Sequence, residues 1–243
     1  MYVAYRLLAA FLAVAPLGAP SASAEARALA TEAQQTRFVA VGRLNVGGQG
    51  HCTATLIEPD LALTAAHCLV NRRTGATWRA ERLVFLPGWH IDAAAAVMRG
   101  RAAALAPGYL ENPGPARDLA LIRVSEAAEG APNPIPVASA EALAASVLAL
   151  SYGRDRGQAL SVQSGCAVVA RQGDLLRTDC DALPGISGAP LVREGADGPE
   201  LVGVIVASVG AEPPAMLGPA LAVAPQGLMP GLRRALAQAE AAQ

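Results

Sequence analysis

The sequence lacks a basic region and, after its first 24 residues, any long apolar run. Lys and Arg total 19 and Asp and Glu total 20, so the formal net charge of the 243 residues is −1. Nucleic-acid-binding domains carry clustered positive charge, so this balance argues against a nucleic acid partner. The absence of a second apolar run argues against a membrane span in the mature chain. The 53% hydrophobic content is enough to form a sizeable core.

Residues 1–24 have the pattern of a signal peptide. One positive charge, Arg6, precedes an apolar stretch at 7–17, and the A-S-A at 22–24 matches a signal-peptidase site. The alternative is a membrane anchor, but the apolar stretch is short and is followed by prolines and a glycine. We therefore expect a secreted or periplasmic protein without a membrane anchor after cleavage.

Only four cysteines are present, Cys52, Cys68, Cys166 and Cys180. An even number in an exported chain favours disulfides. Pairing within each half, Cys52–Cys68 and Cys166–Cys180, is one of three possible connectivities and the one we favour. Each bridge would close a loop of about 15 residues and stabilise the fold by roughly 3 kcal/mol. A zinc site formed by the first two cysteines and their neighbouring histidines is disfavoured, because no close C-x-x-C pair exists. We expect no metal.

Short runs with β character, such as "CTATLI", "LALIRV" and "LVGVIVASV", are separated by Gly, Pro, Asn and Asp. This pattern predicts an antiparallel sandwich or barrels. The stretch at 129–142 is rich in Pro, Ala and Ser and is the expected connector between two β halves. We therefore expect an N-terminal half at 38–130 and a C-terminal half at 131–243. Residues 25–37 are interpreted as a lead-in or pro-segment, either a short helix or flexible.

The end of the chain predicts a helix. Leu228, Leu232 and Leu236 are spaced i, i+4, i+8, which places them on one helix face. We expect this helix to dock on the second half.

Three stretches carry the groups that a serine nucleophile requires. "LTAAHC" contains His67, "RDLALIRV" contains Asp118, and "GISG" contains Ser187. Such catalysis needs a base for the hydroxyl proton, a carboxylate to orient that base, and N–H groups aimed at the developing oxyanion. Small residues around Ser187 permit a tight turn. The alternatives are a strand-edge charge at Asp118 and an ordinary turn residue at Ser187.

In this order, T-A-A-H-C, D-L-A-L-I and G-x-S-G-x-P resemble the trypsin/chymotrypsin-like serine protease family. The resemblance runs from about Phe38 to the terminal helix. It implies an all-β fold of two antiparallel six-stranded β-barrels with a C-terminal α-helix and the active site between the barrels. Ser187 would attack a peptide carbonyl, His67 would move the proton, and Asp118 would orient His67. The N–H groups of Gly185 and Ser187 would form the oxyanion hole.

The same resemblance implies an endopeptidase that takes a protein or peptide substrate and needs no cofactor, and we expect a monomer. The run "TDCDALPGISGAP" is most similar to the bacterial branch that includes the glutamyl endopeptidases. In the digestive branch, an Asp before the nucleophile pairs with a new amino terminus, whereas this chain has Ile186 there. An Ile-Val-Gly-Gly start near residue 38 is also missing. We therefore expect no activation by an N-terminal ion pair.

The sequence defines less clearly which substrate residue is preferred before the cut bond. Asp181 lies six residues before the serine, where trypsin-like members keep the carboxylate that binds Arg or Lys. The alternative is that Asp181 faces a turn or an internal partner. The strand that contains Val206, Ala207 and Ser208 is expected to line the specificity pocket and pair with the substrate backbone. Its Gly203-Val204-Ile205 lacks the histidine of glutamate-specific relatives, which argues against a preference for glutamate.

Two further function classes remain open. A catalytically silent relative would bind a peptide or protein through the same cleft, although the complete His, Asp and Ser set argues against it. An esterase is disfavoured, because the sequence around Ser187 lacks the G-x-S-x-G elbow of the α/β type.

Overall fold

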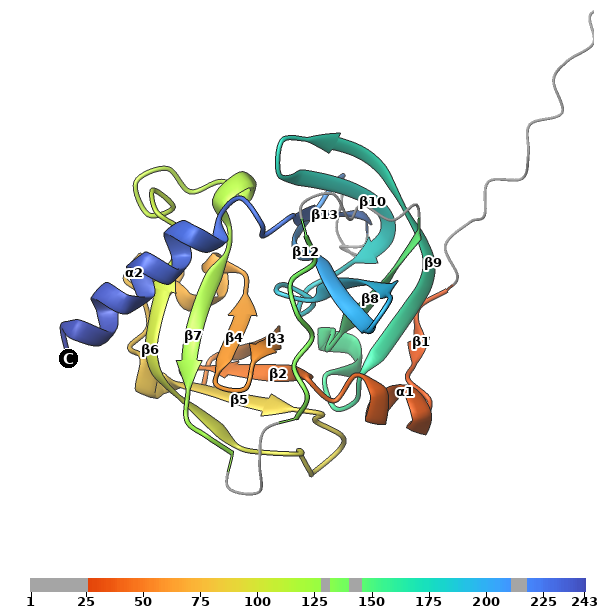
Figure 1. The fold of residues 1–243 in the computed structure, drawn as a ribbon, viewed down its shortest axis with the longest axis horizontal. Coiled ribbons are helices and arrows are strands. Elements are labelled where there is room, and N and C mark those ends of the chain that lie inside the picture. The colour runs from red at the N-terminus through yellow and green to blue at the C-terminus, as the bar shows by residue number, and fades with distance from the viewer. Residues whose placement is uncertain (1–25, 128–131, 140–145, 211–217) are drawn as a thin grey trace, which may run out of the picture.

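The computed structural model describes residues 26–127, 132–139, 146–210 and 218–243. The expected signal peptide and parts of the expected connector therefore lie outside the described residues. Strands are the main secondary structure of the described residues, which also include an α-helix close to each end (Figure 1).

The first half forms a closed antiparallel barrel in the order β2-β3-β4-β7-β6-β5, in which β2 pairs with both β3 and β5. Its interior is apolar because alternate side chains of each strand point inward. In β6, for example, Met98 is buried whereas its neighbour Arg99 is exposed. The strands are β2 Val41–Val46, β3 Gly50–Glu58, β4 Leu61–Thr64, β5 Leu83–Pro87, β6 Met98–Leu105 and β7 Ala120–Val124.

The second half forms another closed barrel in the order β8-β9-β10-β13-β12-β11, with β8 pairing with both β9 and β11. The prediction of two six-stranded antiparallel barrels is therefore confirmed. Full closure leaves few unpaired strand edges. The strands are β8 Ser146–Ser151, β9 Ser161–Gln172, β10 Leu175–Ala182, β11 Pro190–Gly195, β12 Gly198–Ser208 and β13 Gly218–Val223.

The lead-in before the first barrel is ordered against the second barrel. Strand β1, Ala28–Leu29, pairs antiparallel with β9, and helix α1, Glu32–Arg37, follows it. Thr31 and Gln34 form a capping box that satisfies N–H groups at the start of α1. The short-helix alternative is thus the one observed.

The C-terminal helix α2, Met229–Ala241, forms as the leucine spacing predicts, but it packs on β6 and β7 of the first barrel (Figure 1). The expectation that it docks on the second half is wrong. Its buried face contains Leu232 and Leu236, and Arg233 pairs with Glu58 of β3. The i, i+4 pattern identified an apolar face but contained no information about its partner. Neither of the described helices is long and apolar enough to cross a membrane.

Two disulfides link neighbouring segments, as the local pairing predicts. Cys52 of β3 is bonded to Cys68 in the turn after β4. Cys166 of β9 is bonded to Cys180 of β10. Because both sulfurs of the first pair are bonded to each other, the alternative zinc site has lost its two thiolate ligands.

Candidate active site

His67 lies in a short 3₁₀ turn, η1, Ala66–Leu69, that follows the fully buried strand β4. The hydroxyl of Thr64, at the end of β4, donates to the carbonyl oxygen of Thr53 at 2.8 Å and fixes the strand end to β3. The His67 side chain is 21% exposed. The apolar residues of "LALT" therefore anchor the segment in the core and leave the imidazole at the surface of the site.

Asp118 holds His67 through two hydrogen bonds. The His67 backbone N–H donates to Asp118 Oδ1 at 2.8 Å, and ring atom Nδ1 lies 2.7 Å from Oδ2. A carboxylate accepts only, so Nδ1 carries the proton and Nε2 is left with a lone pair. Asp118 is 6% exposed, which keeps its charge close to the imidazole and away from water. The pair has the geometry of an oriented general base.

Tyr109 was not identified from the sequence, although it contacts the same carboxylate. Its phenol hydrogen-bonds to Asp118, and burial, followed by the charge and hydrogen bond of Asp118, raises the pKa of Tyr109 to about 12. The hydroxyl therefore stays protonated and donates to the carboxylate. Gly108, the residue before Tyr109, favours a turn, but no local sequence pattern indicates that Tyr109 contacts Asp118.

Ser187 sits in a turn that needs glycine at two positions. Gly185 has φ +98°, and a Cβ there would lie 2.5 Å from the backbone N of Arg154. Gly188 has φ +83°, and a Cβ there would lie 2.1 Å from the carbonyl oxygen of Thr53. Both backbone angles are strained for residues with side chains. The glycines allow the turn to fold tightly against both barrels.

The turn leaves two N–H groups free. Among the described residues, the N–H groups of Gly185 and Ser187 donate to no protein acceptor, whereas that of Ile186 donates to the carbonyl oxygen of Leu183 at 3.3 Å. Ile186 is 2% exposed and packs in the core of the second barrel. An apolar anchor thus occupies the position where the digestive branch has an aspartate.

Ser187 lies beside the disulfide that adjoins His67. Its carbonyl oxygen accepts from the Thr53 N–H at 2.9 Å and lies 3.9 Å from Cys68 Sγ. Cys68 follows His67 directly. Within the described part of the chain, Ser187 Oγ makes no direct hydrogen bond to the His67 ring. Such bonds are often long in proteins without substrate and tighten when the substrate binds.

Asp181 faces an internal partner. Its backbone N–H donates to Gln163 Oε1 at 2.8 Å, and Gln163 Nε2 donates to Asp181 Oδ2 at 3.3 Å. This contact agrees with the internal-partner alternative. In β12, Val206 is buried, Ala207 is exposed and Ser208 is half-buried.

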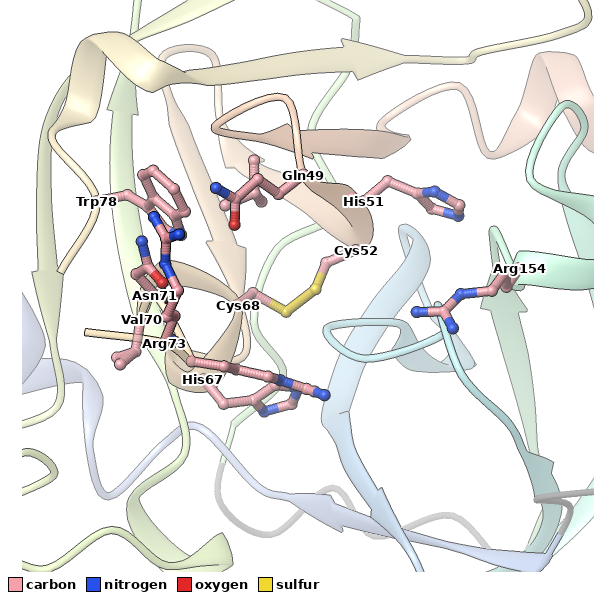
Figure 2. A pocket seen from close by; sticks show the side chains of 13 residues that line it. Gln49, His51, Cys52, His67, Cys68, Val70, Asn71, Arg73, Trp78 and Arg154 are labelled. Atoms are coloured by element: carbon pink, nitrogen blue, oxygen red, sulfur yellow. Dashed lines mark hydrogen bonds between the residues drawn. A yellow bond between two sulfur atoms is a disulfide. The ribbon is translucent and has the colours of Figure 1, made fainter. Parts of the chain in front are cut away.

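A cavity of about 390 Å³ lies directly beside His67 and the Cys52–Cys68 disulfide. Figure 2 shows Asn71, Arg73 and Trp78 on one side and His51 and Arg154 on the other. Its cationic lining, Arg72, Arg73 and Arg154, was missed in the sequence. The runs "NRR" and "GRDRG" contain these arginines, but nothing in the sequence brings position 154 next to position 72.

Comparison with known proteins identifies the family and the fold. The family model of the trypsin-like peptidase domain matches residues 52–204. A solved Glu endopeptidase in complex with MPD matches with a TM-score of 0.71 and 19% sequence identity, covering 87% of this chain and 97% of that chain. At this identity the match shows a shared fold. No curated protein matches significantly. The family model matches more than half of the chain, which shows that the chain belongs to the trypsin-like peptidase family.

Proposed function

We propose that the protein is an exported serine endopeptidase in which Ser187 is the nucleophile, His67 the general base and Asp118 the group that orients it. The observation that carries the proposal is the double hydrogen bond from His67 to Asp118. It fixes one tautomer, in which Nε2 is available to accept a proton. The family's peptidase fold supports the hydrolysis of peptide bonds.

Catalysis begins when Ser187 Oγ attacks the carbonyl carbon and His67 Nε2 takes the hydroxyl proton. The imidazolium that forms is stabilised by the buried charge of Asp118. The carbonyl oxygen becomes an oxyanion and accepts from the free N–H groups of Gly185 and Ser187. Each such donor contributes roughly 100- to 1000-fold in rate.

His67 then gives its proton to the leaving amine, the C–N bond breaks, and an acyl ester remains on Ser187. Water attacks the ester with His67 again as base, which releases the acid and restores the hydroxyl. Every group that reacts in these steps belongs to the protein, the substrate or water, so the proposed mechanism requires no metal or cofactor.

Selection of the residue before the cut bond is assigned to the region of Asp181, Val206, Ala207 and Ser208. The hydrogen bonds between Asp181 and Gln163 occupy part of the carboxylate, which weakens the case for a basic side chain there. Ala207 and Ser208 pair with β13 on one edge of β12, whereas the pairing with β11 ends at Val204. Among the described residues, the end of β12 is thus left with one edge for a substrate strand.

Export is proposed on two grounds. Residues 1–24 have the signal-peptide pattern, and the two disulfides fit an oxidising compartment. The protein is therefore assigned to the periplasm or the extracellular space. A monomer with the two barrels at 38–130 and 131–243 is proposed separately, on the family resemblance of the sequence.

A second candidate is a catalytically silent peptide-binding protein. It is favoured by one observation, the lack of a direct hydrogen bond between Ser187 Oγ and the His67 ring in the described structure. In that case the cleft would hold a peptide without acylation of the serine.

A fluorophosphonate probe separates the two candidates. We expect one covalent adduct on the folded protein, none on Ser187→Ala, and an unchanged adduct on Ser125→Ala, which alters a serine that follows β7. Intact mass spectrometry gives the count. Absence of an adduct on the folded parent would overturn the proposed catalysis and leave the binding candidate.

A further inference from the structure

The cavity beside His67 lies on the leaving-group side of the proposed reaction. His67 must deliver its proton to the leaving amine, and the cavity is lined by His67 and the Cys52–Cys68 disulfide. None of its lining residues comes from β12, along which the acyl half of the substrate is expected to run, or from β10, which contains Asp181. The space therefore remains for the segment that follows the cut bond.

This cavity carries unbalanced positive charge. Arg72, Arg73 and Arg154 line it, and its lining contains no aspartate or glutamate. Among the described residues, none of these three arginines forms an ion pair. Cations gathered in a concave site focus an attractive potential on anions.

Two carboxylates close in sequence to cavity residues or bonded to them have other partners. Asp155, next to Arg154 in the chain, pairs with Arg27 and also lies 3.7 Å from Arg156. Asp118 does not line the cavity and accepts both His67 hydrogen bonds. The guanidinium of Arg154 extends toward the disulfide (Figure 2). It is therefore available to an incoming ligand.

His51 adds to the selectivity of the cavity. Its Nε2 lies 3.1 Å from the Tyr152 carbonyl oxygen. Burial, followed by the charge of Arg43, lowers the pKa of His51, and the charge of Arg154 lowers it further. The ring is thus neutral at pH 7 and donates to the carbonyl oxygen. The positive charges around it disfavour a cationic ligand in the cavity.

We propose that this cavity binds a carboxylate on the leaving-group segment of the substrate, so that the enzyme favours Asp or Glu at the first or second position after the cut bond. Arg72, Arg73 and Arg154 are the specificity residues, since guanidinium groups bind carboxylates through paired N–H donors. This inference rests on the proposed function. This cavity selects the substrate residue that follows the cut bond. That selection is separate from any preference for the residue that precedes the cut bond.

Acyl transfer tests the leaving-group side alone. The protein is acylated with an ester substrate, and a dipeptide amide competes with water for the acyl group. Attack by the amine forms an amide bond, breaks the ester and returns the proton to Ser187. We expect Glu-Ala-amide to be captured about tenfold better than Gln-Ala-amide. Ala-Glu-amide compared with Ala-Gln-amide applies the same test to the second position after the cut bond.

Charge variants connect the preference to the cavity. The Glu-to-Gln capture ratio should fall to about one in Arg72→Gln/Arg154→Gln. In Arg154→Glu, Lys-Ala-amide should be captured better than Glu-Ala-amide. Arg79→Gln is the matched control, because Arg79 is 84% exposed and does not line the cavity. A ratio within one variant cancels differences in the amount of folded protein.

Equal capture of the acidic and neutral amides by the parent at both positions, or an unchanged ratio in the double variant, would overturn the inference. If the fluorophosphonate labels no serine, the proposed function fails and the cavity is tested by binding instead. Ligand-observed NMR should then show Glu-Ala-amide binding more tightly than Gln-Ala-amide to the parent but not to the double variant. Equal binding of the two amides would overturn the inference in that case as well.

Discussion

Asp118 binds His67 twice, once through the backbone N–H at 2.8 Å and once through ring Nδ1 at 2.7 Å. The backbone contact fixes the position of the carboxylate relative to the turn, and the ring contact fixes the imidazole relative to the carboxylate. The orientation of the proposed base thus depends on one side chain that is almost fully buried.

Replacing that carboxylate should affect catalysis far more than stability. Asp118→Asn keeps the size of the side chain, but its amide can donate to Nδ1 and so favours the tautomer with the proton on Nε2. We expect kcat on an ester substrate to fall by about 10⁴-fold at neutral pH. Tyr109→Phe, which removes the phenol donor and leaves the carboxylate, is the control and should cost far less. An Asp118→Asn variant with nearly full activity would contradict the proposed role.

Gly185→Ala should distort the proposed oxyanion hole. The added Cβ would lie 2.5 Å from the Arg154 backbone N, in addition to the strain of φ +98°. We expect activity to fall by at least 100-fold and the free energy of unfolding to fall by about 1–3 kcal/mol. Gly173→Ala is the matched control, since it also has a positive φ but nothing within 4 Å of the added Cβ. Stopped-flow acylation and urea unfolding measure the two effects. Equal effects of the two substitutions would argue against a special role for this turn.

A chain that starts at Phe38 should be less stable than one that starts at Glu25, and no more active. The shorter chain loses the pairing of β1 with β9, the α1 capping box and the ion pair between Arg27 and Asp155. We expect a loss of roughly 2 kcal/mol in urea unfolding. A large gain in activity on trimming to Phe38 would instead indicate activation by a new amino terminus.

Stability should depend on pH through His51. Its pKa is lowered in the folded state, chiefly by burial, from an ordinary value of 6.5. The unfolded chain therefore takes up this proton at a higher pH than the folded chain does. The stability present above pH 6.5 is lost as the pH falls through the folded-state pKa. Urea unfolding at neutral and mildly acidic pH, for the parent and for His51→Gln, isolates this contribution.

In this comparison the parent should lose more stability than His51→Gln as the pH falls, because glutamine does not titrate in this range. The glutamine amide also keeps a donor for the Tyr152 carbonyl oxygen. Parallel pH profiles for the two proteins would contradict the assignment.

The fold could be predicted from local sequence patterns, and the choice of candidate residues rests on patterns of the same kind. The segment around His67 combines an apolar strand with a polar terminus, and Ser187 is surrounded by small residues that require a turn. The pairing of Cys52 with Cys68 and of Cys166 with Cys180 is also local in the chain. Each of these inferences needs only a few consecutive residues.

The features that were missed depend on contacts between distant segments. Arg154, between β8 and β9 of the second barrel, lines the same cavity as Arg72, which follows β4 of the first barrel. Tyr109 is recognised only through its bond to Asp118. In the same way, Gln163 becomes the partner of Asp181 through the pairing geometry of the second barrel. No spacing rule connects such residues, because their proximity is set by the packing of whole strands.

The two ends of the described chain exchange partners between the barrels. Strand β1, close to the beginning, pairs with β9 of the second barrel, whereas α2, at the end, covers β6 and β7 of the first. The second barrel is therefore extended by a strand that precedes the first barrel in the chain, and the first barrel is covered by a helix that follows the second. During synthesis the first barrel therefore acquires the cover that α2 provides only after the strands of the second barrel have been made. A chain that stops before α2 would leave this face of β6 and β7 without its apolar cover.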